Sequence, residues 1–247
     1  MKKNIVTHGS CLSIKVADSL VERFNFKRVS STQHVRTDVY VDTYIKQILD
    51  PIKSYEFHFQ YKEQYKDTGL VENQIIDMKF GRSLPGKLAN ADLVNHRDAI
   101  ESGKIDLLLI DNFPDIYFKV YKNQIDNQKL FLNKEYFEYF DDNFVFENEF
   151  LAIDKYVESL EILIKDFKKH NPISEVVFIN FPVNLNSNEF LRNRALEMYK
   201  RVLSIPGICV IDPIGVYRHD LTIANDIHHF TPKKYRQIAS TVFGEVS

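Results

Sequence analysis

The sequence contains only two cysteines, Cys11 and Cys209, among its 247 residues. Two cysteines are too few for a disulfide-stabilised scaffold, and their spacing does not match a metal-binding motif. A small secreted domain built on disulfides is therefore excluded. The low cysteine content instead favours a reducing, cytoplasmic setting.

The sequence also lacks long apolar runs. A membrane-spanning helix needs about 20 predominantly apolar residues, and no segment approaches that length. The basic residues at the N-terminus are followed by a short apolar run that His8, Gly9 and Ser10 interrupt. We therefore expect neither a secretory signal peptide nor an integral membrane segment.

An excess of positive charge is absent as well. The chain has 32 lysines and arginines against 34 acidic residues, a formal net charge of −2. No global positive field would recruit nucleic acid, so nucleic-acid binding is not expected and any site for a polyanion must be a local patch. With 44% hydrophobic residues, the chain is long enough for one sizeable core, and we expect a single domain over residues 1–247.

What the sequence does contain is an alternation of predicted strands and helices. Strands are predicted where short apolar runs end in polar residues, and helices where apolar residues recur every three or four positions. The predicted strands cover 4–9, 105–110, 175–180 and 207–213, and the predicted helices follow Ser10, Ala152, Ser187 and Thr231. This order predicts an α/β fold, a three-layer α/β/α sandwich with a mainly parallel central sheet.

Three other segments have less regular patterns. Residues 28–36 are polar and basic and are predicted to form a loop, whereas aromatic residues alternate over 55–61, which predicts a half-buried strand. Residues 117–150 show no clean period and are interpreted as a helical and loop insertion.

The first predicted strand delivers Ser10 to a tight turn before a helix. Gly9 removes side-chain bulk where the chain bends, and the helix N-terminus leaves backbone N–H groups free to face a developing negative charge. This geometry suits a nucleophile, with the N–H groups near Ser10 as oxyanion donors. A serine nucleophile also needs a base and an orienting acid.

The loop before the last predicted helix supplies candidates for both. Asp226 precedes His228 and His229, and Thr231 caps the helix that follows. Asp226 would hold the imidazole of the base in the correct tautomer. We favour His228 as the base, because His229 lies beside the helix cap, where a packing or capping role is plausible.

Further candidates lie near the predicted ends of strands. Asn112 follows the buried strand 105–110 and is a candidate amide donor to the oxyanion hole, and Gly81 in a second turn is a candidate backbone donor. The cations proposed to contact an anionic substrate are Arg28, Arg36, Arg82 and Lys87.

These residues resemble the four sequence blocks of the SGNH (GDSL-like) hydrolases, which are α/β-hydrolase-like serine acyl-transfer enzymes. The resemblance assigns Ser10 as nucleophile, Gly81 and Asn112 as oxyanion donors, and Asp226 with a histidine as acid and base. The chain departs from the family in having Gly-Ser-Cys for Gly-Asp-Ser and Asp111-Asn112-Phe113 for Gly-x-Asn-Asp. The family's Asp-x-x-His spacing, read strictly, pairs Asp226 with His229 rather than His228.

More narrowly, the Gly-Ser-Cys and His-His-Phe-Thr-Pro segments resemble capsule polysaccharide O-acetyltransferases. That resemblance implies acetyl transfer from acetyl-CoA, through an acetyl-serine, to a hydroxyl of N-acetylmannosamine in a phosphodiester-linked capsular polymer. Peripheral association with the capsule synthesis machinery would then be expected. No Gly-x-Gly-x-x-Gly loop indicates how CoA is held.

Several alternatives remain open at this stage. Cys11 could be the nucleophile, because a helix start lowers the pKa of a thiol. A zinc site is not expected, although five residues offer ligand atoms: His219, Asp220, Asp226, His228 and His229. The same triad could serve an esterase or deacetylase with water as acceptor, or the chain could bind a polysaccharide without catalysis.

Overall fold

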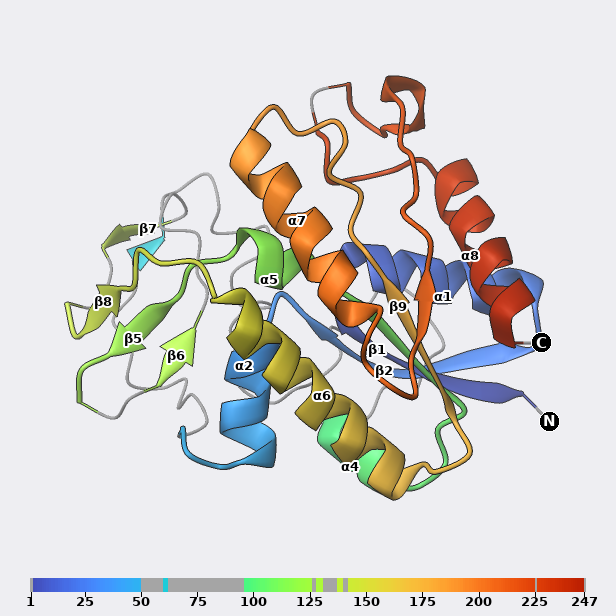
Figure 1. Ribbon diagram of the computed structural model, residues 1–247, viewed down its shortest axis with the longest axis horizontal. Helices are drawn as coiled ribbons and strands as arrows, with labels where there is room; N and C mark the ends of the chain where they lie inside the picture. The colour runs from blue at the N-terminus through green and yellow to red at the C-terminus, as the bar shows by residue number, and fades with distance from the viewer. Residues whose placement is uncertain are drawn as a thin grey trace.

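The computed structural model describes residues 2–49, 60–61, 96–125, 128–130, 137–139, 142–224 and 226–246. Its centre is a five-stranded sheet with the strand order β10-β9-β4-β1-β2, and every neighbouring pair is parallel (Figure 1). The strands are β1 (Lys3–Gly9), β2 (Phe26–Gln33), β4 (Leu107–Asp111), β9 (Glu175–Ile179) and β10 (Cys209–Ile211). The predicted parallel sheet is therefore confirmed.

Helices cover both faces of this sheet. In Figure 1, α6 and α7 cross in front of the strands, whereas α1 lies behind them and packs against α8. The helices are α1 (Cys11–Arg23), α2 (Thr37–Tyr40), α4 (His96–Glu101), α5 (Phe113–Tyr117), α6 (Ile153–His170), α7 (Glu189–Val202) and α8 (Pro232–Val246). A π-helical turn, η1 (Val41–Ile45), continues α2, and a 3-10 turn, η4 (Arg218–Asp220), precedes the last loop. The arrangement is the predicted three-layer sandwich.

The core forms because the central strands are apolar on both faces and the helices on one. All five residues of β4 are buried, as expected for a strand covered by helices on both sides. In α6, Tyr156, Leu160, Leu163 and Phe167 are fully buried and recur at helical spacing. Within the described residues, no helix combines the length and apolarity needed to cross a membrane.

The segment predicted as a loop over 28–36 is instead mostly strand. β2 runs to Gln33 and pairs with β1 along its whole length. Its buried positions carry the small hydroxyl side chains of Ser30, Ser31 and Thr32. Because these residues are polar, the apolar alternation that identifies a strand is missing from the sequence. A smaller difference is that Asn188, rather than Ser187, caps α7.

The insertion predicted over 117–150 contains strands where helix was expected. Three short antiparallel strands form a separate small sheet: β5 (Tyr121–Asn123), β6 (Lys129–Leu130) and β8 (Phe144–Phe146). A further strand, β7 (Phe137–Tyr139), pairs with β3 (Gln60–Tyr61). β3 is the end of the predicted aromatic strand, whose other residues lie outside the described part of the chain. That all these pieces form one domain remains a prediction.

The chain order of the strands predicts where a ligand would bind. After β1 the chain moves to β2 on one side, and then crosses to β4 on the other side of β1. Ligands in open α/β sheets bind beyond the carboxyl ends of the strands at such a reversal. Ser10 follows β1 and Asn112 follows β4, so both lie at this point.

Candidate active site

Ser10 occupies the turn between β1 and α1, as predicted. Gly9 has a φ of +145°, a conformation that L side chains rarely adopt, and Ser10 is the N-cap residue of α1. The Ser10 Oγ accepts the Leu12 N–H at 3.1 Å, and the residue is 3% exposed. Among the described residues, Ser10 makes no hydrogen bond to a histidine. The serine is held in the predicted place with its hydroxyl at the helix start.

The Asp111 carboxylate lies directly behind this turn. Its Oδ2 accepts the Ser10 N–H at 2.8 Å and the Ser13 N–H at 3.0 Å, and its Oδ1 accepts the Phe113 N–H at 3.1 Å. Burial raises the pKa of Asp111, and these amide donors oppose the rise. The Ser10 N–H therefore already has an acceptor, so the expectation that it faces an oxyanion is wrong for this structure. A Cβ on Gly9 would lie 2.5 Å from Asp111 Oδ2, which explains the glycine.

Asn112, expected as an oxyanion donor, bonds elsewhere. Its Nδ2 donates to Asn180 Oδ1 at 2.8 Å and its Oδ1 accepts the Phe181 N–H at 2.8 Å. The fully buried amide thus joins the ends of β4 and β9. One of the two Nδ2 hydrogens is used in this contact, and the donor role of Asn112 toward an oxyanion stays a prediction. Gly81 lies outside the described residues, and its role stays a prediction.

The acid of the predicted triad pairs with His229, not with His228. Asp226 Oδ2 lies 2.6 Å from His229 Nδ1, while Asp226 Oδ1 accepts only the backbone N–H of His228, at 3.0 Å. Burial favours the neutral form of Asp226, but the two histidine contacts outweigh it and lower its pKa. The side-chain contact of Asp226 is thus with His229 and not with His228, which agrees with the stricter Asp-x-x-His spacing.

His228 has a different environment. Its ring lies edge-on to the rings of Phe113 and Tyr117, with centroids 5.2 Å away in each case. Its Nε2 is buried and has no hydrogen-bond partner in the part of the chain that is described. Burial lowers the pKa of His228. The side chain forms part of an aromatic wall, and within the described residues its ring makes no hydrogen bond to a carboxylate.

A pocket of about 90 Å³ brings the main candidates together. It is lined by Ser10, Cys11, His34, Phe113, Phe181, His228 and His229. The nucleophile candidate and the Asp226-bound histidine therefore open onto the same space. His34 was not predicted as a site residue, because 28–36 was interpreted as a loop. Had β2 been recognised as the parallel neighbour of β1, its carboxyl end would have placed His34 beside Ser10.

Cys11 is a poor alternative nucleophile in this setting. Burial, with the nearby Asp111 carboxylate, raises the pKa of the Cys11 thiol to about 11. The Gln33 amide also donates to its Sγ at 2.8 Å. The expectation that the helix start lowers this pKa is reversed, since burial dominates. The thiol stays protonated near neutral pH.

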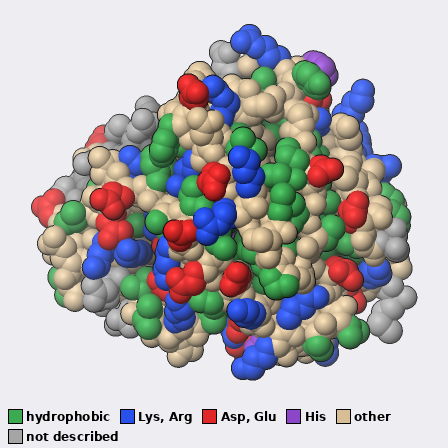
Figure 2. Space-filling model, in the orientation of Figure 1, with side chains coloured by type: hydrophobic (Ala, Val, Ile, Leu, Met, Phe, Trp, Pro, Cys, Tyr) green, Lys and Arg blue, Asp and Glu red, His purple; other side chains and the backbone are tan. Residues whose placement is uncertain are grey.

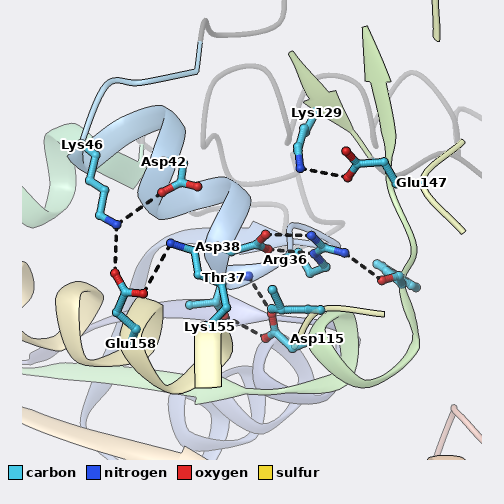
Figure 3. Close-up of polar contacts among 12 residues, drawn as sticks. Arg36, Thr37, Asp38, Asp42, Lys46, Asp115, Lys129, Glu147, Lys155 and Glu158 are labelled. Atoms are coloured by element: carbon cyan, nitrogen blue, oxygen red, sulfur yellow. Dashed lines mark hydrogen bonds and ion pairs between the residues drawn. The ribbon is translucent and has the colours of Figure 1, made fainter. Parts of the chain in front are cut away.

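Two of the expected substrate cations are buried in ion pairs. Arg28 contacts Asp18 at 2.9 Å, and Arg36 forms a two-pronged contact with Asp38 at 2.7 and 2.8 Å. Figure 3 shows the Arg36 guanidinium turned toward the Asp38 carboxylate. The substrate-binding roles predicted for Arg28 and Arg36 are contradicted, because both side chains are buried and form ion pairs within the protein.

The remaining charged side chains give no further support to a polyanion site. Arg82 and Lys87 lie outside the described residues, and their substrate-binding roles stay predictions. On the face in Figure 2, basic and acidic side chains are interspersed rather than gathered by sign. Across the described ranges, no three histidine, cysteine or carboxylate side chains converge to hold a metal ion.

Comparisons with known proteins give a likeness of fold. No protein-family model and no curated protein sequence matches the chain. A carbohydrate esterase family 3 structure from Talaromyces cellulolyticus has 10% identity and a TM-score of 0.48, covering 100% of this chain and 96% of that one. An acetyl-xylooligosaccharide esterase from Geobacillus stearmophilus has 9% identity and a TM-score of 0.48, covering 100% and 96%. A lipase from a goat rumen metagenome has 11% identity and a TM-score of 0.47, covering 98% and 97%. At these identities the likeness concerns the fold and says nothing about activity.

Proposed function

We propose that the chain is a serine-dependent hydrolase of small acyl esters. The observation that carries the proposal is one pocket that holds Ser10, at the N-terminus of α1, together with His229, oriented by Asp226. A nucleophile, a base and an acid that fixes the tautomer of the base are the parts that serine acyl transfer needs.

The chemistry follows from this arrangement. Asp226 holds Nδ1–H of His229, which leaves Nε2 as the basic nitrogen. His229 takes the proton from Ser10 as Oγ attacks the ester carbonyl carbon, and the carbonyl electron pair moves to the oxygen. When that pair returns, the alcohol leaves with the proton from His229, and an acyl-serine remains. Water activated by the same histidine then releases the acid.

The pocket favours a small acyl group. It measures about 90 Å³ and is partly open to solvent. Phe113 and Phe181 form apolar walls that suit a methyl group. An acetyl group fits this space, whereas most of a long fatty acyl chain would lie outside it.

Exposure of the base favours water as the acceptor. The His229 side chain is 52% exposed, so solvent reaches the catalytic face of the site. A transferase that must keep water from an acyl-enzyme has a more enclosed base. Hydrolysis is therefore the function that the geometry supports best.

Acetyl transfer from acetyl-CoA to N-acetylmannosamine is the second candidate. Its support is sequence resemblance: residues 9–11 and 228–232 resemble the capsule polysaccharide O-acetyltransferase of serogroup A meningococci. The buried ion pairs of Arg28 and Arg36 remove two of the cations proposed for its phosphodiester acceptor. Arg82 and Lys87 remain proposed contacts for that polymer, as does Gly81 for the oxyanion.

One set of assays separates these functions. The proposal expects hydrolysis of p-nitrophenyl acetate well above that of p-nitrophenyl octanoate, and an acetyl adduct on Ser10 by mass spectrometry. Ser10→Ala should abolish both. Release of CoA from acetyl-CoA only when capsular polymer is present would instead establish the transferase. Polymer binding without either reaction would establish a binding protein.

A further inference from the structure

The backbone donors nearest to Ser10 are already in use. The Ser10 and Ser13 N–H groups bond to Asp111, and the Leu12 N–H bonds to Ser10 Oγ. The Asn112 amide bonds to Asn180. Serine acyl transfer depends on donors placed where negative charge develops, and removal of one typically costs 100-fold or more in rate, about 10²–10³. The loss of the Ser10 N–H as a donor leaves room for another polar group that faces the pocket to supply this contact.

His34 is such a group. It directly follows β2, and its N–H donates to the Gly9 carbonyl at 2.9 Å, which fixes it beside the nucleophile turn. Its ring lines the same pocket as Ser10 and His229. Its φ is +60°, in the left-handed region that is unfavourable for a residue with a side chain. Such strain is concentrated at functional sites, where the surrounding structure maintains it.

The neighbours of His34 determine which ring nitrogen carries the proton. The Gln33 Nε2 donates to Cys11 Sγ at 2.8 Å and lies 3.5 Å from His34 Nε2. An amide nitrogen carries two hydrogens and accepts none, so we assign His34 Nε2 as the acceptor in this contact. Nδ1 then carries the proton of the neutral ring. Burial, with a smaller effect from His229, lowers the pKa of His34 to about 4, so the ring is neutral near pH 7.

We propose that the neutral imidazole of His34 donates a hydrogen bond to the oxyanion of the tetrahedral intermediate formed on Ser10. This proposal rests on the serine hydrolase function proposed above. As the bond from Ser10 Oγ to the carbonyl carbon forms, the carbonyl π pair becomes the negative charge that His34 contacts. No proton moves from His34, and the contact weakens when the pair returns to expel the alcohol.

The left-handed backbone of His34 makes a clean test available. His34→Gly removes the ring without backbone strain, because glycine adopts this φ freely. We expect kcat for p-nitrophenyl acetate to fall about 100-fold with little change in KM. Added imidazole, which can occupy the vacated space, should restore much of the lost rate. His34→Phe, which fills the space without a donor, should be equally slow and should not respond to imidazole.

A matched control is Gln47→Gly, which relaxes the other described non-glycine residue with a positive φ, 54°. It should keep wild-type kcat and should not respond to imidazole. Wild-type kcat in folded His34→Gly, or a slow variant that imidazole does not restore, would overturn the role of His34. Two results would instead overturn the proposed function, and this inference with it. One is that the wild-type protein hydrolyses no acyl ester, and the other is that Ser10→Ala hydrolyses acyl esters as fast as the wild type.

Discussion

At the scale of single residues, the partners of the two adjacent histidines predict different consequences of mutation. His229→Ala removes the imidazole that Asp226 orients, so we expect kcat for acetyl ester hydrolysis to fall about 1,000-fold. His228→Phe preserves the edge-on contacts with Phe113 and Tyr117 and should keep most of the activity. Steady-state kinetics of the two variants measure this difference. The reverse order of activity would show that His228 is the base.

The Arg36–Asp38 pair predicts an effect on stability rather than on substrate binding. Arg36→Met leaves the buried Asp38 carboxylate without its cation, which should cost about 3–5 kcal/mol in the free energy of unfolding. Adding Asp38→Leu removes the unpaired charge and should recover most of that loss. Urea denaturation of both variants and the wild type gives the values. A raised KM in Arg36→Met with unchanged stability would instead return Arg36 to the substrate site.

The sequence was informative about residues whose partners are close in the chain. The Asp226–His229 contact spans three positions, and the family spacing already indicated it. The contacts that Asn112 and the Ser10 N–H make were not predicted, because their partners lie 68 and 101 positions away. Which donor bonds to which acceptor across strands depends on side-chain direction, which no single-sequence pattern contains.

At the scale of elements, the turn from β1 to α1 is the most constrained. Gly9→Ala forces a residue with a side chain to a φ of +145° and places its Cβ 2.5 Å from Asp111. We expect a loss of about 3 kcal/mol in the free energy of unfolding, together with loss of activity.

Gly244→Ala is a suitable control for this turn. Gly244 lies in α8 with nothing within 4 Å of the position that a Cβ would occupy, and alanine is the better helix former. This variant should be about 0.5–1 kcal/mol more stable than the wild type. Equal thermal stability of the two alanine variants would contradict the close approach of Asp111 to Gly9.

The elements that the sequence predicted correctly are those with an apolar pattern. α6 has its stripe of buried residues and β4 its unbroken apolar run, and both formed where expected. β2 was missed because hydroxyl residues fill its buried positions, where the small side chains fit under the covering helices. The short strands β5 and β8 have three residues each, too few to show a period.

At the scale of the whole molecule, buried histidines predict sensitivity to acid. Burial lowers the pKa of His8 and His34 to about 4 and that of His96 to about 3. These histidines bind protons more readily in the unfolded chain than in the folded one. Their contribution to the free energy of unfolding is therefore complete above about pH 6.5 and is lost as pH falls toward 4. Within that window, each histidine should lower the free energy of unfolding by about 1.4 kcal/mol for each unit that the pH falls.

Asp115 opposes part of this loss. Burial raises its pKa to about 7, so the folded state binds this proton more tightly and gains stability as pH falls below 7. From these four groups alone, three histidines against Asp115, the expected result is two protons taken up on unfolding near pH 5. Urea denaturation between pH 7.5 and 4.5 measures the slope of the free energy of unfolding against pH.

The variant His8→Leu tests one of these groups. It also removes two buried ring nitrogens without partners among the described residues, and it should reduce the slope by one proton. An unchanged slope would contradict the buried neutral state of His8.

The bond between the Asp111 carboxylate and the Ser10 amide also determines when the serine becomes ordered during synthesis. The two residues are 101 positions apart, so Ser10 leaves the ribosome well before its support has been made. At about 5–20 residues per second, the delay is on the order of 5 to 20 s. During that interval a nascent chain with β1, α1 and β2 has the local Ser10 cap of α1 but lacks the Asp111 carboxylate. We therefore expect the turn at Ser10 to reach its final geometry only after β4 has been synthesised and has paired with β1.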